Sequence, residues 1–152
     1  METQNQSRRE AELYQDVYKN VTMGAESLTD LMRHVNEGDL KTEMGVELAQ
    51  YETLAKEARQ ALTDLGVTPH EQGAMTKLSA KAGVMMNTMV DSTPSHVAQM
   101  IIEGATMGTT DLLRKLNEFS CEAGEKKSEA QDLARRTVRF EEDCIEKMKA
   151  YL

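Results

Sequence analysis

The sequence has no tryptophan, only two prolines and 4% aromatic residues, so it lacks much of what β-sheet proteins use for cores and turns. Methionine is abundant instead, with 11 copies among 152 residues. Because methionine is flexible and unbranched, it suits cores made of packed helices. We therefore expect an all-α protein, and the length fits one domain, residues 1–152, with a single sizeable core.

A basic excess, a long apolar run and a paired cysteine motif are absent too. The 18 Lys and Arg residues against 26 Asp and Glu give a net charge of -8, which argues against nucleic acid and anionic membranes as partners. No run approaches the roughly 20 apolar residues of a membrane span. The start METQNQSRREAEL lacks the apolar core of a signal peptide, and Cys121 and Cys144 form no CxxC pair. We expect a cytoplasmic bacterial protein with reduced thiols.

Capping residues divide the chain into five expected helices. Ser7 and Glu10 have the spacing of a capping box, and glycines follow the first two helical patterns. Pro69 and Pro94 each follow a threonine, which predicts a helix start with proline at the first helical position. The expected helices cover approximately residues 8–36, 40–65, 69–91, 94–119 and 125–151.

Apolar residues recur every three or four positions, which is the spacing of helix-bundle seams. The expected inward positions are Leu13, Val17, Val21, Gly24, Leu28, Leu31 and Val35; Met44, Leu48, Tyr51, Ala55, Ala58, Leu62 and Leu65; Val97, Ile101, Ala105, Gly108, Leu112, Leu116 and Phe119; and Ala134, Val138, Glu141, Ile145, Met148 and Leu152.

The segment 67–93 decides the expected topology. It is much longer than the connections of a simple up-and-down bundle. A helix of about 20 residues spans about 30 Å, roughly the length of the neighbouring helices. The sequence thus predicts a four-helix bundle of two helical hairpins joined by a long crossover that contains a fifth helix, with the second and fourth helices running in the same direction.

The stretch TVRFEEDCIEKM, residues 137–148, places Glu141 in the middle of an apolar helix face. A buried carboxylate is costly unless something pairs with it. Three explanations are open. Glu141 and Glu47 hold a metal, helped by Cys144; or they share a proton or pair with Thr137, Tyr51 or Gln50; or Glu141 borders a subunit interface or a wetter end of the bundle.

Two hairpins joined by a long crossover resemble the ferritin-like superfamily. Family members that bind two metals carry an inward Glu on one helix of each hairpin and a Glu-x-x-His motif on the other. In this chain Glu47-Leu-Ala-Gln50 and Glu141-Glu-Asp-Cys144 stand where the two motifs would be. Gln50 and Cys144 therefore replace the two histidines.

The other two helices depart further from the pattern of the family. Glu26 and Glu103 are expected to point away from the core, by the 100° step per residue of a helix. The inward places hold other residues instead, namely Asn20, Gly24, Ser27 and Gly108. An intact di-iron oxidase or ferroxidase site is not expected. Gly24, Gly104, Ala105 and Gly108 are expected to let neighbouring helices approach closely.

These observations lead to two functional hypotheses. The first is a non-enzymatic ferritin-like bundle that acts as a structural or protein-interaction homo-oligomer, a dimer, with an unknown protein partner. Its Met-rich third helix would suit such contacts. The second is a bundle that binds iron, manganese or zinc through Glu47 and Glu141, with Cys144 and Gln50 as further ligands. Apart from that divalent metal, no cofactor is expected.

Overall fold

The computed structural model describes residues 2–70, 91–123 and 128–152 of the chain. Four long helices, α1 (Glu2–Met32), α2 (Asp39–Asp64), α4 (Pro94–Ala123) and α5 (Glu129–Met148), form a bundle, and a short 3-10 turn, Lys149–Tyr151, ends it. These residues contain no strand. The protein is all-α, as the sequence predicts.

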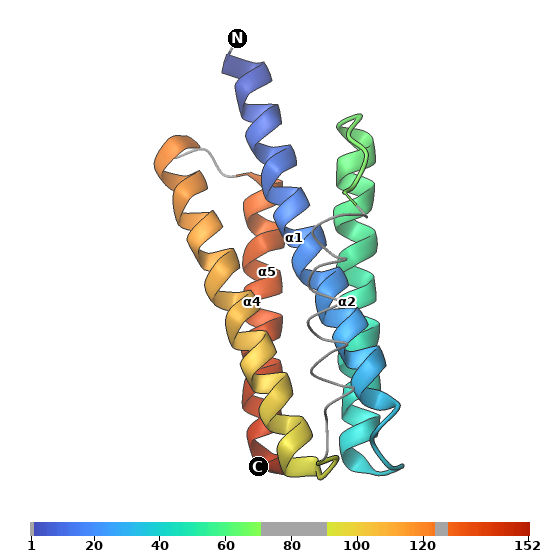
Figure 1. Ribbon diagram of the computed structural model, residues 1–152. Helices are drawn as coiled ribbons and strands as arrows, with labels where there is room; N and C mark the ends of the chain where they lie inside the picture. Colours follow the sequence, from blue (N-terminus) through green and yellow to red (C-terminus); the bar gives the residue numbers. More distant parts are fainter. Residues whose placement is uncertain (1, 71–90, 124–127) are drawn as a thin grey trace.

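The two hairpins of the bundle are α1 with α2 and α4 with α5 (Figure 1). α2 and α4 run in the same direction, as expected for a long connection between the hairpins, and the two termini lie at opposite ends of the bundle (Figure 1). α1 contacts all three other long helices, whereas α2 touches α5 only sparsely. No helix of the described residues combines the length and the apolar character needed to cross a membrane.

The helix boundaries differ from the expected ones at several places. α1 begins at Glu2, so Ser7 is an exposed residue inside the helix and the capping box predicted there is wrong. The expected third helix, 69–91, falls largely outside the described residues, and its first two positions are not helical. There the Gln15 side chain on α1 donates to the Thr68 carbonyl and accepts from the His70 backbone N–H, which fixes the chain where it leaves α2.

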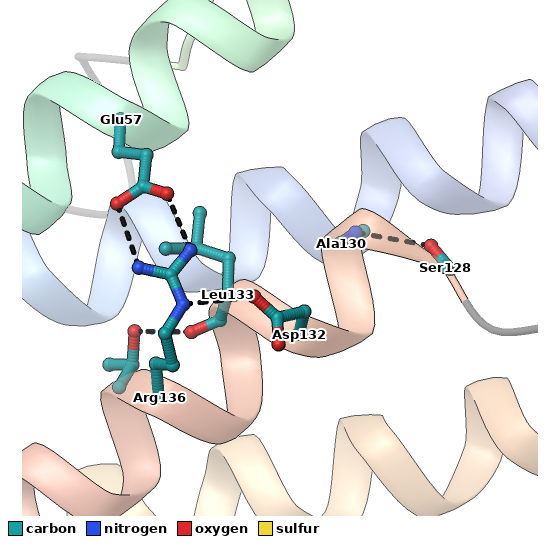
Figure 2. A network of polar contacts seen from close by, with 7 residues as sticks. Glu57, Ser128, Ala130, Asp132, Leu133 and Arg136 are labelled. Carbon is teal, nitrogen blue, oxygen red and sulfur yellow. Dashed lines mark hydrogen bonds and ion pairs between the residues drawn. The ribbon is translucent and has the colours of Figure 1, made fainter.

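α5 has the capping box that the first helix lacks. The Ser128 hydroxyl accepts from the Ala130 N–H, and the Gln131 side chain accepts from the Ser128 N–H (the Ser128 bond is drawn in Figure 2). Gln131 also donates to the Ser120 hydroxyl on α4 at 3.0 Å. The expected start near residue 125 is therefore too early, because the chain is capped at Ser128 and becomes helical at Glu129.

The core follows the predicted apolar stripes closely. On α1, α4 and α5 nearly every expected inward residue is buried, and only Leu65 on α2 and the terminal Leu152 are exposed. Leu54 and Thr137, at 1% and 0% exposed, are core residues that the stripes did not include. The periodicity of the sequence thus predicts which face of each of the four helices is buried. Polar groups also lie in the middle of the core.

Ser128→Ala should lower the free energy of unfolding by about 1 kcal/mol, because the first turn of α5 loses its side-chain acceptor. Urea unfolding followed by circular dichroism measures this change. Ser7→Ala is the matched control and should leave stability nearly unchanged, because Ser7 caps no helix. Equal losses in the two variants would contradict the placement of the cap.

Candidate functional site

Two carboxyl groups lie in the middle of the bundle. Glu47 on α2 is 2% exposed and Glu141 on α5 is 1% exposed, which confirms that both are inward residues. We call Asn20, Glu47, Tyr51, Glu141 and Cys144 the buried acid layer. It contains residues from α1, α2 and α5, and the α4 backbone closes it at Gly108.

Glu141 lies against the backbone of α4. A side-chain carbon at Gly108 would be only 2.5 Å from the Glu141 Oε2 atom, so the carboxyl group fills the space that a larger residue would take. Asn20 on α1 donates to the Gly108 carbonyl at 3.0 Å and also hydrogen-bonds Glu141. Burial raises the pKa of Glu141 to about 8, while the Asn20 hydrogen bond lowers it in part.

Glu47 is less well satisfied than Glu141. Neither of its carboxyl oxygens has a hydrogen-bond partner in good geometry among the described residues. Burial and the neighbouring Glu43 carboxylate raise the pKa of Glu47 to about 7, and the nearby Cys144 thiol and Lys147 ammonium lower it in part. Lys147 itself is paired with Glu43, its Nζ atom 3.4 Å from Oε1. A neutral Glu47 side chain therefore fits this position best.

Burial also keeps the other two titratable groups of the layer neutral. It raises the pKa of the Cys144 thiol, and the Glu47 and Glu141 carboxylates raise it further. It raises the pKa of the Tyr51 phenol in the same way. Since only a thiolate is a strong nucleophile or metal ligand, the structure gives Cys144 the character of an inert core thiol.

Tyr51 fills the space beside Gly24 on α1. A side-chain carbon at Gly24 would be 2.5 Å from the Tyr51 Cε1 atom. The Tyr51 ring also meets the Phe140 ring of α5 edge to face, with centroids 4.8 Å apart. The predicted role of Gly24 and Gly108 in close packing is thus confirmed, although the partners are a ring and a carboxyl group. The prediction for Gly104 is wrong, because it is exposed and nothing lies near its missing side chain.

The structure separates the other predicted site residues. Gln50 is exposed and lies outside the acid layer, and the Thr137 hydroxyl donates to the Leu133 carbonyl of its own helix at 2.8 Å. Glu26 and Glu103 are exposed, as expected. Asn20 is the partner of Glu141 that the sequence did not identify. The one indication in the sequence is that Asn20 is an amide at an inward position of the first helix.

The described residues do not bring three metal-binding side chains together. No group of three or more His, Cys, Asp or Glu side chains among residues 2–70, 91–123 and 128–152 has the arrangement needed to hold a metal ion. Three carboxyl oxygens have no hydrogen-bond partner within these described ranges, namely both oxygens of Glu47 and the Oε1 atom of Glu141. Water would have to complete any coordination shell that they formed.

Comparisons of this chain with protein-family models, with curated proteins and with solved structures find no match.

Gly108→Ala should destabilise the protein by about 1 to 3 kcal/mol, because the added methyl group meets the Glu141 carboxyl group and forces it to move. Gly104→Ala, one turn earlier on the same helix, should be neutral or stabilise by up to about 1 kcal/mol, since alanine favours the helix and has open space there. Urea unfolding compares the two. A Gly108→Ala variant as stable as Gly104→Ala would contradict the close approach.

Stability should fall as the pH rises from about 5 to about 8. The folded pKa values of Glu141 and Glu47, about 8 and about 7, lie above the ordinary value of 4.5, so the folded state binds protons more tightly than the unfolded chain. The contribution is complete below the unfolded pKa and is lost as the pH rises through the folded pKa. Glu141→Gln should flatten this profile and stabilise the protein by about 1 to 4 kcal/mol at pH 8 or above.

Thermal unfolding as a function of pH tests this expectation. Glu142→Gln is the matched control, because Glu142 is the next residue of α5 and is exposed. Its profile should follow that of the parent protein. If Glu141→Gln also kept the slope of the parent, Glu141 would not be the group responsible.

Proposed function

We propose that this chain is a cytoplasmic ferritin-like helical bundle of bacterial origin without a catalytic centre, acting as a structural or protein-interaction homo-oligomer. The direction of the four helices supports this proposal, because hairpins joined by a long connection are the architecture of that superfamily. The described site supports the absence of a catalytic role, since its thiol and phenol are held neutral and its acids lie in the packed core.

One observation carries the proposal. At the inward places on α1 and α4, where a two-metal member of the superfamily would present Glu, this chain has Gly24 and Gly108. The space beside these glycines is taken by the Tyr51 ring and the Glu141 carboxyl group. The middle of the bundle is therefore filled by protein groups at the level where the superfamily would place its metals.

A homodimer is the simplest assembly for this bundle. Met107 on α4 and Val46 on α2 are 70% and 57% exposed, so both large apolar side chains are available for contact with a second copy of the chain. The Met-rich segment expected between α2 and α4 lies mostly outside the described residues, and its part in such contacts stays a prediction.

Sedimentation equilibrium of the full chain tests the assembly. The expected mass is twice the 17.0 kDa of one chain, independent of metal. Met107→Asp should shift the equilibrium toward the monomer by about tenfold or more, whereas Thr106→Asp, its exposed neighbour, should not. A monomer at every concentration, even about 100 μM, would contradict the proposed homo-oligomer.

A second function is favoured by the buried carboxyl oxygens that have no hydrogen-bond partner among the described residues. Glu47 and Glu141 would hold a divalent metal, iron, manganese or zinc, with Cys144 beside them and water completing the shell. Two carboxylates and water suit a hard or borderline cation, so the chemistry fits in part, although a third protein ligand is missing among the described residues.

Elemental analysis of the purified protein, after growth with iron, zinc and manganese, separates the two functions. The first function predicts less than about one tenth of a metal ion per chain in the parent protein, in Glu141→Gln and in the exposed control Glu142→Gln. Near-stoichiometric metal that disappears only in Glu141→Gln would support the second function and overturn the first.

A further inference from the structure

The contacts between the two hairpins are unequal. α1 packs along α4 and α5, and each hairpin is well packed within itself, whereas α2 meets α5 only sparsely. Among the described residues, α2 thus contacts the bundle chiefly through α1. In Figure 1 the α2 ribbon stands apart from α4 and α5 over much of its length. We call the contact between α2 and α5 the α2–α5 seam.

Two ion pairs cross the described α2–α5 seam. Arg136 of α5 forms two parallel hydrogen bonds with the Glu57 carboxylate of α2, one of them at 3.0 Å (Figure 2). Further along, Lys147 pairs with Glu43 at 3.4 Å. Both ion pairs are partly exposed, Arg136 at 42% and Glu57 at 44%. Exposed ion pairs contribute little to stability, although a two-bond arginine pair is among the stronger ones.

Between these two ion pairs, the interior of the seam contains groups that disfavour its closure. Glu47 of α2 is fully covered, while neither of its oxygens has a hydrogen-bond partner in good geometry in the part of the chain that the structure describes. Opposite it lies the Cys144 thiol, 2% exposed. A buried polar group without a partner destabilises the closed state, because it has lost its hydrogen bonds to water. Opening of the seam would hydrate the group and remove this penalty. The edge-to-face contact between Tyr51 of α2 and Phe140 of α5 is the one described ring contact, and it favours closure of the seam.

We propose that the α2–α5 seam is a gate, which opens locally while the rest of the bundle stays folded. Opening hydrates Glu47 and exposes Cys144, and α2 keeps its contact with α1. Closure is secured by the Arg136–Glu57 pair at the edge of the seam. The gate gives solutes access to the acid layer from the side of the bundle, without unfolding of either hairpin.

The chain carries its own reporter for this motion. It has two cysteines, Cys121 exposed and Cys144 buried in the seam. In a Cys121→Ser background, alkylation by iodoacetamide measures the exposure of Cys144 alone. Dividing the rate by that of the same chain unfolded in urea, extrapolated to the same conditions, removes the reactivity of the thiol itself. The remaining ratio is the opening equilibrium.

A local gate gives alkylation that changes little with low concentrations of urea, because opening exposes little surface. The alkylation rate is also higher than global unfolding can account for, when the free energy of global unfolding is measured on the same protein by circular dichroism. Alkylation that rises with urea as steeply as global unfolding would overturn the proposal.

Substitutions on the two sides of the seam test its energetics. Arg136→Gln removes the closing pair and should speed alkylation about fivefold, whereas Arg139→Gln, an exposed arginine one turn away, should not. Glu47→Met removes the buried polar group while keeping its volume and should slow alkylation about tenfold. Glu52→Met, at an exposed position of α2, is its control.

Each variant is first checked for an unchanged helix content. Rates that match those of the paired controls, for both Arg136→Gln and Glu47→Met, would overturn the gate even if Cys144 reacted locally. If Glu47→Met failed to fold, the Arg136 pair of variants would decide alone.

Discussion

The middle of this bundle depends on the absence of a side chain at Gly108. Because Gly108 has no side chain, the Glu141 carboxyl group of α5 lies against the backbone of α4. The Gly108 carbonyl also accepts a hydrogen bond from the Asn20 amide of α1. One glycine thus lets three helices share a single polar contact. A methyl group at this point would separate α4 from α5 or displace the amide, and the apolar layers above and below would have to follow.

The same principle acts a second time on the other hairpin, between Gly24 and Tyr51. Each glycine faces a large group from a neighbouring helix, and each large group belongs to the buried acid layer. The layer is therefore a packing solution as much as a polar one, since its groups fill volume that aliphatic residues fill elsewhere in the core. Its cost is desolvation of two carboxyl groups, which burial offsets by raising their pKa values, so that near pH 7 Glu141 is mostly neutral and Glu47 is about half protonated.

Much of this fold can be predicted from the sequence, because the apolar spacing specifies which face of each helix is buried. The inward position of Glu141 follows from the same spacing. The partner of Glu141 does not, because an amide at an inward position has several neighbours and the sequence cannot choose among them. Ser7 shows the limit of local rules, because it has a capping pattern, yet α1 begins at Glu2 and continues through it.

The two Glu-x-x-x motifs compared with the ferritin-like pattern differ in how their residues lie. Glu47 is buried, but Gln50, in a histidine place of that pattern, is exposed. The position of a residue three places along a helix depends on how the helix is rotated about its axis. That rotation is set by the packing of neighbours such as Tyr51 and Phe140, which a motif does not encode.

The Gln15 amide of α1 determines where the chain leaves the first hairpin. It fixes the point where the chain leaves α2, and Asp91 and Thr93 fix the point where it enters α4, through hydrogen bonds to the Thr93 and His96 N–H groups. Both ends of the connection between α2 and α4 are thus fixed by hydrogen bonds to residues of the bundle or to residues next to it in the sequence. These hydrogen bonds join residues outside the segment 71–90, so the side chains of that segment are not needed to form them.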